Sequence, residues 1–152
     1  MNRLFTASIF VAIAMALSVP SPAVAQNFPP SVTQKIHAAQ KQVNTIGLEE
    51  YRKVVESPGE ALIIDVREPQ EFAAGHVPGA VNIPRGLVEF RIWKQVGFPA
   101  NPDTNRPVYL QCQNGNRASL AAQSLAELGF TNTTAVGMSF DGWQQAGHPL
   151  VK

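Results

Sequence analysis

The only cysteine of the chain, Cys112, begins a short polar segment that ends at Arg117. A cysteine reacts as its thiolate, and the pKa of a thiol falls when a cation and a helix N-terminus lie close to it. Gly115 permits backbone torsions that other residues avoid, so several amide N–H groups can converge on one point. The pattern predicts a Cys112 nucleophile inside an anion-binding loop. The other members of that loop are Gln113, Asn114 and Asn116.

Two simpler interpretations of the same segment stay open. Gly115 alone would explain a turn, without any chemistry in the loop. Cys112 could also be a buried cysteine that packs as a small apolar residue. Because a turn requires neither a cysteine nor an arginine, the combination of Cys112, Gly115 and Arg117 favours a site.

Alternating strands and helices are predicted around this segment. Ala61–Val66 and Val108–Gln111 are short apolar runs, typical of strands buried on both faces. Shorter strands are expected at Ala80–Ile83 and Thr133–Val136. Helical patterns occupy residues 47–55, 68–75, 87–96, 117–128 and 142–146. The alternation predicts an α/β fold with a parallel sheet, and Cys112 follows the carboxyl end of a strand, where such sheets place their binding sites.

The N-terminus is interpreted as an export signal. Residues 1–25 combine Arg3, an apolar run of about 15 residues and a closing Ala-Val-Ala, which is the layout of a cleaved signal peptide. An uncleaved membrane anchor is the alternative, but the run is shorter than the roughly 20 residues needed to cross a bilayer. Cleavage after Ala25 is therefore favoured, and no stable membrane anchor is expected afterwards. Residues 26–43 are predicted to be an extension with a linker and a short helix, in which Ser31 and Gln34 form the cap. Residues 44–152 are predicted to be the main domain.

Composition limits the function. The 152 residues suit one folded domain, and a formal net charge of +1 gives no basic surface for nucleic acid. A single cysteine excludes an internal disulfide, and in an exported protein it indicates an intermolecular partner or a reactive thiol. No spacing of histidines and the cysteine suits a metal ion, so neither a metal nor a cofactor is expected.

Three motifs carry a family resemblance. CQNGNR (112–117) resembles the C-x-x-G-x-R active-site loop of the rhodanese-like sulfurtransferases. DVREPQEFAAGHVPGAVNIP (65–84) resembles the family's upstream signature, and GMSFDGWQQAGHP (137–149) resembles its closing motif. The chain is therefore identified as a member of that family, over nearly the whole main domain.

The resemblance implies a rhodanese-like fold, with a five-stranded parallel sheet and helices on both faces. It implies a sulfurtransferase that moves a sulfane sulfur from a donor such as thiosulfate, through a persulfide on Cys112, to a thiophilic acceptor. The acceptor would be cyanide, a thiol or a protein. Residues 113–117 would bind the substrate. The chain departs from the family pattern at Gln113, where many members that use thiosulfate have a basic residue, and at Met138, which replaces a glycine.

The remaining polar residues of the motifs are assigned supporting roles. Charged groups near a core need partners, so Asp65 and Arg67 are predicted to be structural. Glu71 and His76 are expected to cap or fix loops. The export signal places the protein outside the cytoplasm, in the periplasm if the source is bacterial.

Two rival functions are weighed against sulfur transfer. Tyrosine phosphatases and arsenate reductases use a related loop, but the phosphatase signature has one residue more than the four that separate Cys112 from Arg117. A non-catalytic sulfur carrier or binding module would need the same loop as the enzyme. Turnover, rather than sequence, distinguishes a carrier from a catalyst.

Overall fold

A computed structural model describes residues 28–152, so the predicted signal peptide (1–25) lies outside the described residues. Within that range, no helix has the length and apolarity needed to cross a membrane. The strands are β1 (Asn44–Ile46), β2 (Leu62–Asp65), β3 (Val81–Asn82), β4 (Val108–Gln111) and β5 (Thr133–Val136). The helices are α1 (Pro30–Gln42), α2 (Leu48–Glu56), α3 (Pro69–Ala74), α4 (Val88–Gln95), α5 (Asn116–Glu127) and α6 (Phe140–Gln145), with a 3-10 turn at Arg85–Leu87.

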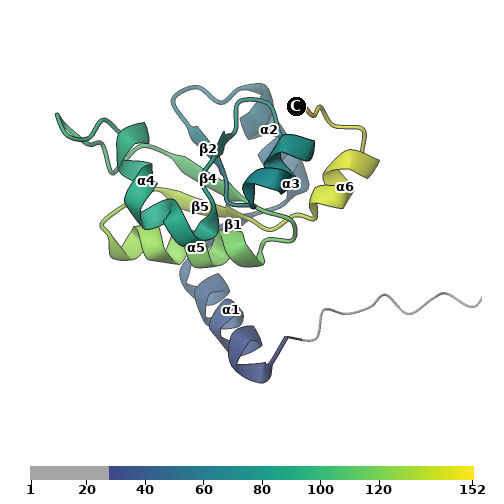
Figure 1. Cartoon of the computed structure of the whole chain (residues 1–152), viewed down its shortest axis with the longest axis horizontal. Coiled ribbons are helices and arrows are strands. Elements are labelled where there is room, and N and C mark those ends of the chain that lie inside the picture. Colours follow the sequence, from purple (N-terminus) through teal and green to yellow (C-terminus); the bar gives the residue numbers. More distant parts are fainter. Residues whose placement is uncertain (1–27) are drawn as a thin grey trace, which may run out of the picture.

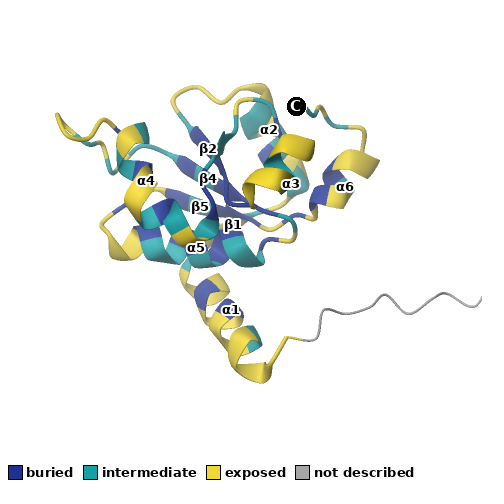
Figure 2. Ribbon diagram, viewed as in Figure 1, coloured by how far each residue is buried: buried dark blue, intermediate teal, exposed yellow. Residues whose placement is uncertain are grey.

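The five strands form one parallel sheet in the order β1-β5-β4-β2-β3 (Figure 1). The apolar residues of β2 alternate between two cores: Leu62 and Ile64 pack toward α4 and α5, whereas Ile63 packs toward α2 and α6. Figure 2 shows the central strands β2, β4 and β5 among the most deeply buried parts of the molecule, between these helices. The predicted α/β fold, with a five-stranded parallel sheet and helices on both faces, is confirmed.

The structure differs from the sequence prediction before the second helix. α1 begins at Pro30, and no side chain caps its first turn, so the Ser31 cap was wrong. Proline suits a first helical turn because its missing N–H has no intrahelical acceptor there. The edge strand β1 has no counterpart in the prediction. Only Ile46 among its three residues is even partly buried, so the strand leaves no apolar pattern in the sequence.

Strand register aligns the site at the carboxyl ends of the sheet. Asp65 ends β2 and lies opposite Asn82 of β3 on one side and Gln111 of β4 on the other. Cys112 and Arg67 therefore leave the sheet at the same edge. The two motifs that contain them, far apart in sequence, are brought together by parallel pairing of β2 with β4.

Candidate active site

Cys112 lies at the start of the loop between β4 and α5 and is buried. The residue is 1% exposed and belongs to the core cluster that also contains Leu110 and Ala118. It forms no disulfide. Burial is what the interpretation as a small apolar residue requires, so a reactive role for Cys112 depends on the groups of the loop around it.

The loop after Cys112 leaves a set of backbone donors unused. Gln113 accepts a hydrogen bond from the Phe140 amide at 2.8 Å, and the Asn116 amide donates to Asn114 Oδ1 at 3.3 Å. No acceptor within residues 28–152 pairs with the amide N–H groups of Gln113, Asn114, Gly115, Arg117 and Ala118. The last two belong to the first turn of α5, where the helix dipole favours negative charge. These donors can stabilise an anion beside the sulfur.

Gly115 is required by the path of this loop. Its φ of +83° lies in the left-handed region, and an added Cβ would be 3.3 Å from both Gly137 Cα and Val136 O. We expect Gly115→Ala to lower the free energy of unfolding by about 2 to 3 kcal/mol, because it adds crowding to backbone strain. Chemical denaturation measures the change.

Gly129→Ala is the matched control for this substitution. Gly129 has a similar φ of +90°, but nothing lies within 4 Å of an added Cβ. Gly129→Ala should lower the free energy of unfolding by about 1 kcal/mol, from backbone strain alone. Equal losses in the two variants would contradict a crowded Gly115 loop.

Arg117 holds the loop to α3. Its guanidinium donates to both oxygens of Glu71, with Nη1 to Oε2 at 2.7 Å and Nη2 to Oε1 at 2.8 Å. A bidentate pair of this kind fixes the guanidinium in one orientation. The sequence left Arg117 either facing a bound anion or holding the loop, and the structure has it in the second position. Its assignment to substrate binding stays a prediction.

The ion pair changes the titration of Glu71. Hydrogen bonds from Arg117 lower the pKa of Glu71 from 4.5 to about 2; burial opposes the shift, and the Glu68 amide N–H, which donates at 3.0 Å, adds to it. Because the pKa is lower in the folded state, the pair stabilises the fold above about pH 4.5 and ceases to do so as the pH falls toward 2.

Glu71→Gln tests this linkage. Glu71 is about a third exposed, so solvent screening limits the expected loss in free energy of unfolding to about 1 kcal/mol near neutral pH. The loss should shrink as the pH falls through the same acid range, because the wild-type carboxylate then gains a proton. Urea denaturation at a series of pH values measures it, with the exposed Glu127→Gln as control. A wild-type-to-variant difference that stays constant with pH would show that the pair does not stabilise the fold.

A buried charged cluster lies at the carboxyl ends of β2 and β4, next to the Cys112 loop. Arg67 donates to Asp65 through Nη2 at 2.7 Å and through Nε at 3.0 Å, and both side chains are almost fully buried. Gln111, directly before Cys112, donates to Asp65 Oδ2 at 2.6 Å. The Arg67 guanidinium also contacts the Gly75 carbonyl at 2.8 Å and lies 3.7 Å from the centre of the Phe140 ring. The cluster thus connects β2, β4, α3 and α6 around the cysteine.

His76 follows Gly75 at the end of α3, and its ring packs on that helix. Its ring stacks on Phe72 at 3.6 Å, and its Nδ1 is 3.1 Å from the Phe72 carbonyl. Its backbone pairs with Val151, which attaches the C-terminal segment. These contacts suit the loop-fixing role expected of His76, which stays a prediction.

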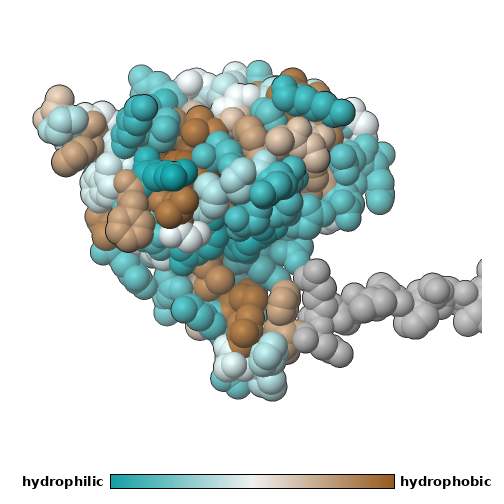
Figure 3. Space-filling view, in the orientation of Figure 1, coloured by the Kyte–Doolittle hydropathy of each residue, from teal (hydrophilic) through white to brown (hydrophobic). Residues whose placement is uncertain are grey.

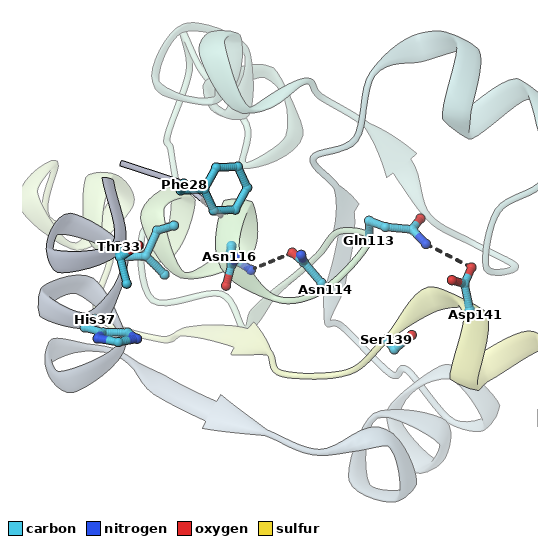
Figure 4. Close-up of a pocket in the computed structure, with 9 residues that line it drawn as sticks. Phe28, Thr33, His37, Gln113, Asn114, Asn116, Ser139 and Asp141 are labelled. Carbon is cyan, nitrogen blue, oxygen red and sulfur yellow. Dashed lines mark hydrogen bonds between the residues drawn. The ribbon is translucent and has the colours of Figure 1, made fainter. Parts of the chain in front are cut away.

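Two groups at the loop were missed by sequence reasoning. Asp141 of α6 accepts a hydrogen bond from Gln113 Nε2 at 2.9 Å, so the side chain after the cysteine is held toward an acidic residue. Helix α1 and the preceding Phe28 face the same loop across a hollow (Figure 4). Neither contact could be read from spacing, because Asp141 lies 28 residues from Gln113 and α1 precedes the motifs altogether.

Comparison with known families decides the class of protein. The model of the rhodanese-like domain matches residues 48–146. The chain belongs to the rhodanese-like domain family. The uncharacterized protein YqhL of Bacillus subtilis (strain 168) is 38% identical over 104 residues, which are 68% of this chain and 75% of that protein. The expected family membership is confirmed.

Rhodanese-like relatives with named activities include sulfurtransferases. Thiosulfate sulfurtransferase GlpE of Pseudomonas entomophila (strain L48) is 32% identical over 84 residues, 55% of this chain and 71% of that protein. Among solved structures, the polysulfide-sulfur transferase homodimer of Wolinella succinogenes superposes with a TM-score of 0.64 at 26% identity, covering 80% of this chain and 87% of that one. A rhodanese-like domain with sulfurtransferase relatives is thus established.

Proposed function

We propose that this rhodanese-like protein is a sulfurtransferase that carries sulfur as a persulfide on Cys112. The Cys112 thiolate attacks the outer sulfur of a donor such as thiosulfate; the sulfur–sulfur bond of the donor breaks, and sulfite leaves with the electron pair. Cyanide or a thiolate then attacks the outer sulfur of the persulfide. The bond to Cys112 breaks and its thiolate is restored, so ping-pong kinetics are expected.

One observation carries the proposal: amides without an acceptor in the described chain follow Cys112 directly, at residues 113–115. A persulfide bears its charge on the outer sulfur, where several N–H donors and the N-terminus of α5 can stabilise it. The interpretation as a mere turn accounts for the position of Gly115 but gives these donors no role. A loop of four residues between cysteine and arginine also suits sulfur better than the larger phosphate or arsenate, which disfavours the phosphatase alternative.

Turnover and mass test the proposal together. After incubation with thiosulfate or polysulfide, intact protein should gain one sulfur, about 32 Da. Addition of cyanide should remove that mass and release thiocyanate through many cycles. Loading without repeated turnover would favour the carrier alternative, and no mass gain with any donor would refute the persulfide.

Export is a separate part of the proposal. Residues 1–25 would direct the chain across the cytoplasmic membrane of a bacterial host and be removed after Ala25. Intact mass of the protein recovered from the periplasm should correspond to a chain that begins at Gln26. A chain that keeps Met1 and stays with the membrane would contradict this.

A further inference from the structure

A hollow of about 440 Å³ lies beside the Cys112 loop, between α1 and α5. Its apolar wall consists of Phe28, Val32, Ile36 and Leu120. The other side is formed by Asn114, Asn116 and the Arg117–Glu71 ion pair, with Gln113 at the loop itself. Small organic ligands occupy hollows of roughly 300 to 1,000 Å³ that are mostly apolar with a few polar groups, and this one fits that description.

Helix α1, which carries part of the apolar wall, is held on α5 by buried residues other than Phe28 and Val32. Ile36 and Ala39 are buried, and α1 packs on α5 through this face, with Gln123 Nε2 donating to Gln42 Oε1 at 2.8 Å. Phe28 and Val32 stay 43% and 40% exposed, and Figure 3 shows apolar surface along α1. The whole of α1 precedes residue 48, where the family match begins. The α1 side of the hollow therefore lies outside the residues that the family model matches, whereas Asn114, Asn116 and Arg117 lie within them.

Charge around the hollow disfavours a dianion. The guanidinium of Arg117, which lines the hollow, already donates to both oxygens of Glu71, and the Gln113 side chain is neutral. In the adjoining hollow of about 500 Å³, Asp141 adds an acidic group next to Gln113 (Figure 4). A small dianion would gain little from this wall, whereas a neutral hydrocarbon chain would be removed from water by it.

We propose that this hollow is the acceptor site for a small organic thiol with an apolar chain and no dianionic group. The inference rests on the proposed persulfide of Cys112. The thiolate of the acceptor attacks the outer sulfur, the bond between that sulfur and Cys112 breaks, and the electron pair returns to the Cys112 thiolate. The product is the persulfide of the organic thiol, and no oxidant or reductant is consumed.

The length of the acceptor tests the site. Protein loaded with sulfur is mixed with ω-hydroxyalkyl thiols of increasing chain length, and unloading is followed by intact mass. The second-order rate constant should rise roughly two- to fourfold per added methylene until the hollow is filled. The same thiols reacting with a small-molecule persulfide give the intrinsic rates. An unloading rate that follows the intrinsic rates at every chain length would overturn the proposal.

Two variants locate the effect on α1. Phe28→Ser and Val32→Ser remove exposed apolar side chains, so each should fold. Each is expected to reduce the preference for the longest thiol over cyanide about five- to tenfold. Phe90→Ser is the matched control, because Phe90 is 78% exposed on α4 and lines neither hollow. Equal preferences in all three variants and wild type would place the acceptor elsewhere.

The cyanide measurement separates this inference from the proposed function. If the protein gains sulfur and releases thiocyanate but ignores thiol length, the acceptor site is wrong and the sulfurtransferase stands. If it never gains sulfur, the persulfide and this inference fail together. An unloading rate constant that rises with thiol chain length, and a length dependence that is weaker in Phe28→Ser, would support both.

Discussion

Cys112→Ala is expected to abolish the gain of one sulfur atom and to reduce turnover with thiosulfate and cyanide by about a thousandfold or more. The proposed reaction forms and breaks a bond at this sulfur in each half-cycle, and Cys112 is the only thiol of the chain. The loop amides would remain, but they would stabilise an anion with no nucleophile beside it. Intact mass and thiocyanate release measure the two effects independently.

Alanine is the better substitution here because Cys112 is buried among apolar residues. Serine would place a hydroxyl in the core, and an unpartnered hydroxyl costs about 1 to 3 kcal/mol. Cys112→Ala should therefore unfold close to the wild-type temperature and Cys112→Ser at a lower one. A Cys112→Ala protein that still gained sulfur would disprove the mechanism. If Cys112→Ala did not fold, Cys112→Ser would be tested instead, at a temperature below the melting temperature of that variant.

Burial of Cys112 restricts what can react with it. A residue that is 1% exposed cannot be approached by a bulky reagent unless the loop moves, whereas a terminal sulfur atom of a donor is small and has no substituents beyond its one bond. A persulfide would place a second sulfur atom about 2 Å beyond that of Cys112. The same burial that suits a core cysteine is thus compatible with a selective sulfur site.

The fold could be predicted largely from local patterns, because the decisive signals are short. The buried runs that became β2 and β4, and glycine and proline at the ends of helices, fix the alternation of elements. Gly129 ends α5 at φ +90°, as its position after the last apolar residue indicates. Strand β1 was not predicted, because an exposed edge strand of three residues needs no apolar periodicity.

The site could be predicted only in part, since its residues meet through tertiary packing. Cys112 and Gly115 are only three residues apart in sequence, so their motif reveals the loop directly. The partner of Arg117 is Glu71, 46 residues away, and only the pairing of β2 with β4 brings their motifs together. The apolar wall at Phe28 depends on how α1 docks on α5, and nothing in the composition of α1 specifies that contact.

Arg67→Met is expected to be the most destabilising of the supporting substitutions. Asp65 and Arg67 are buried together, and removal of one partner leaves the other charge without compensation in the core. Breaking a buried pair in this way costs about 3 to 5 kcal/mol. For a domain of this size, the loss corresponds to a fall in Tm of about 10 to 20 °C. Thermal unfolding followed by circular dichroism measures it.

Arg52→Met makes the same chemical change on the surface and serves as the control. Arg52 pairs with Glu49 and Glu56 along α2, where both carboxylates are exposed. Exposed pairs contribute little to stability, so the Tm of Arg52→Met should fall by a few degrees at most. A similar loss in both variants would mean that Arg67 does not compensate a buried charge.

A double variant distinguishes the charge from the packing of Arg67. Asp65→Asn together with Arg67→Met removes both buried charges while keeping side chains of similar size. If the cost of Arg67→Met comes from an unpaired Asp65 carboxylate, the double variant should be more stable than the sum of the single losses implies, by about 1 to 3 kcal/mol. Gln111 would still bond the residue at position 65, so the strand end before Cys112 keeps one of its contacts. Strictly additive losses would show instead that Arg67 stabilises the loop through Gly75 and Phe140.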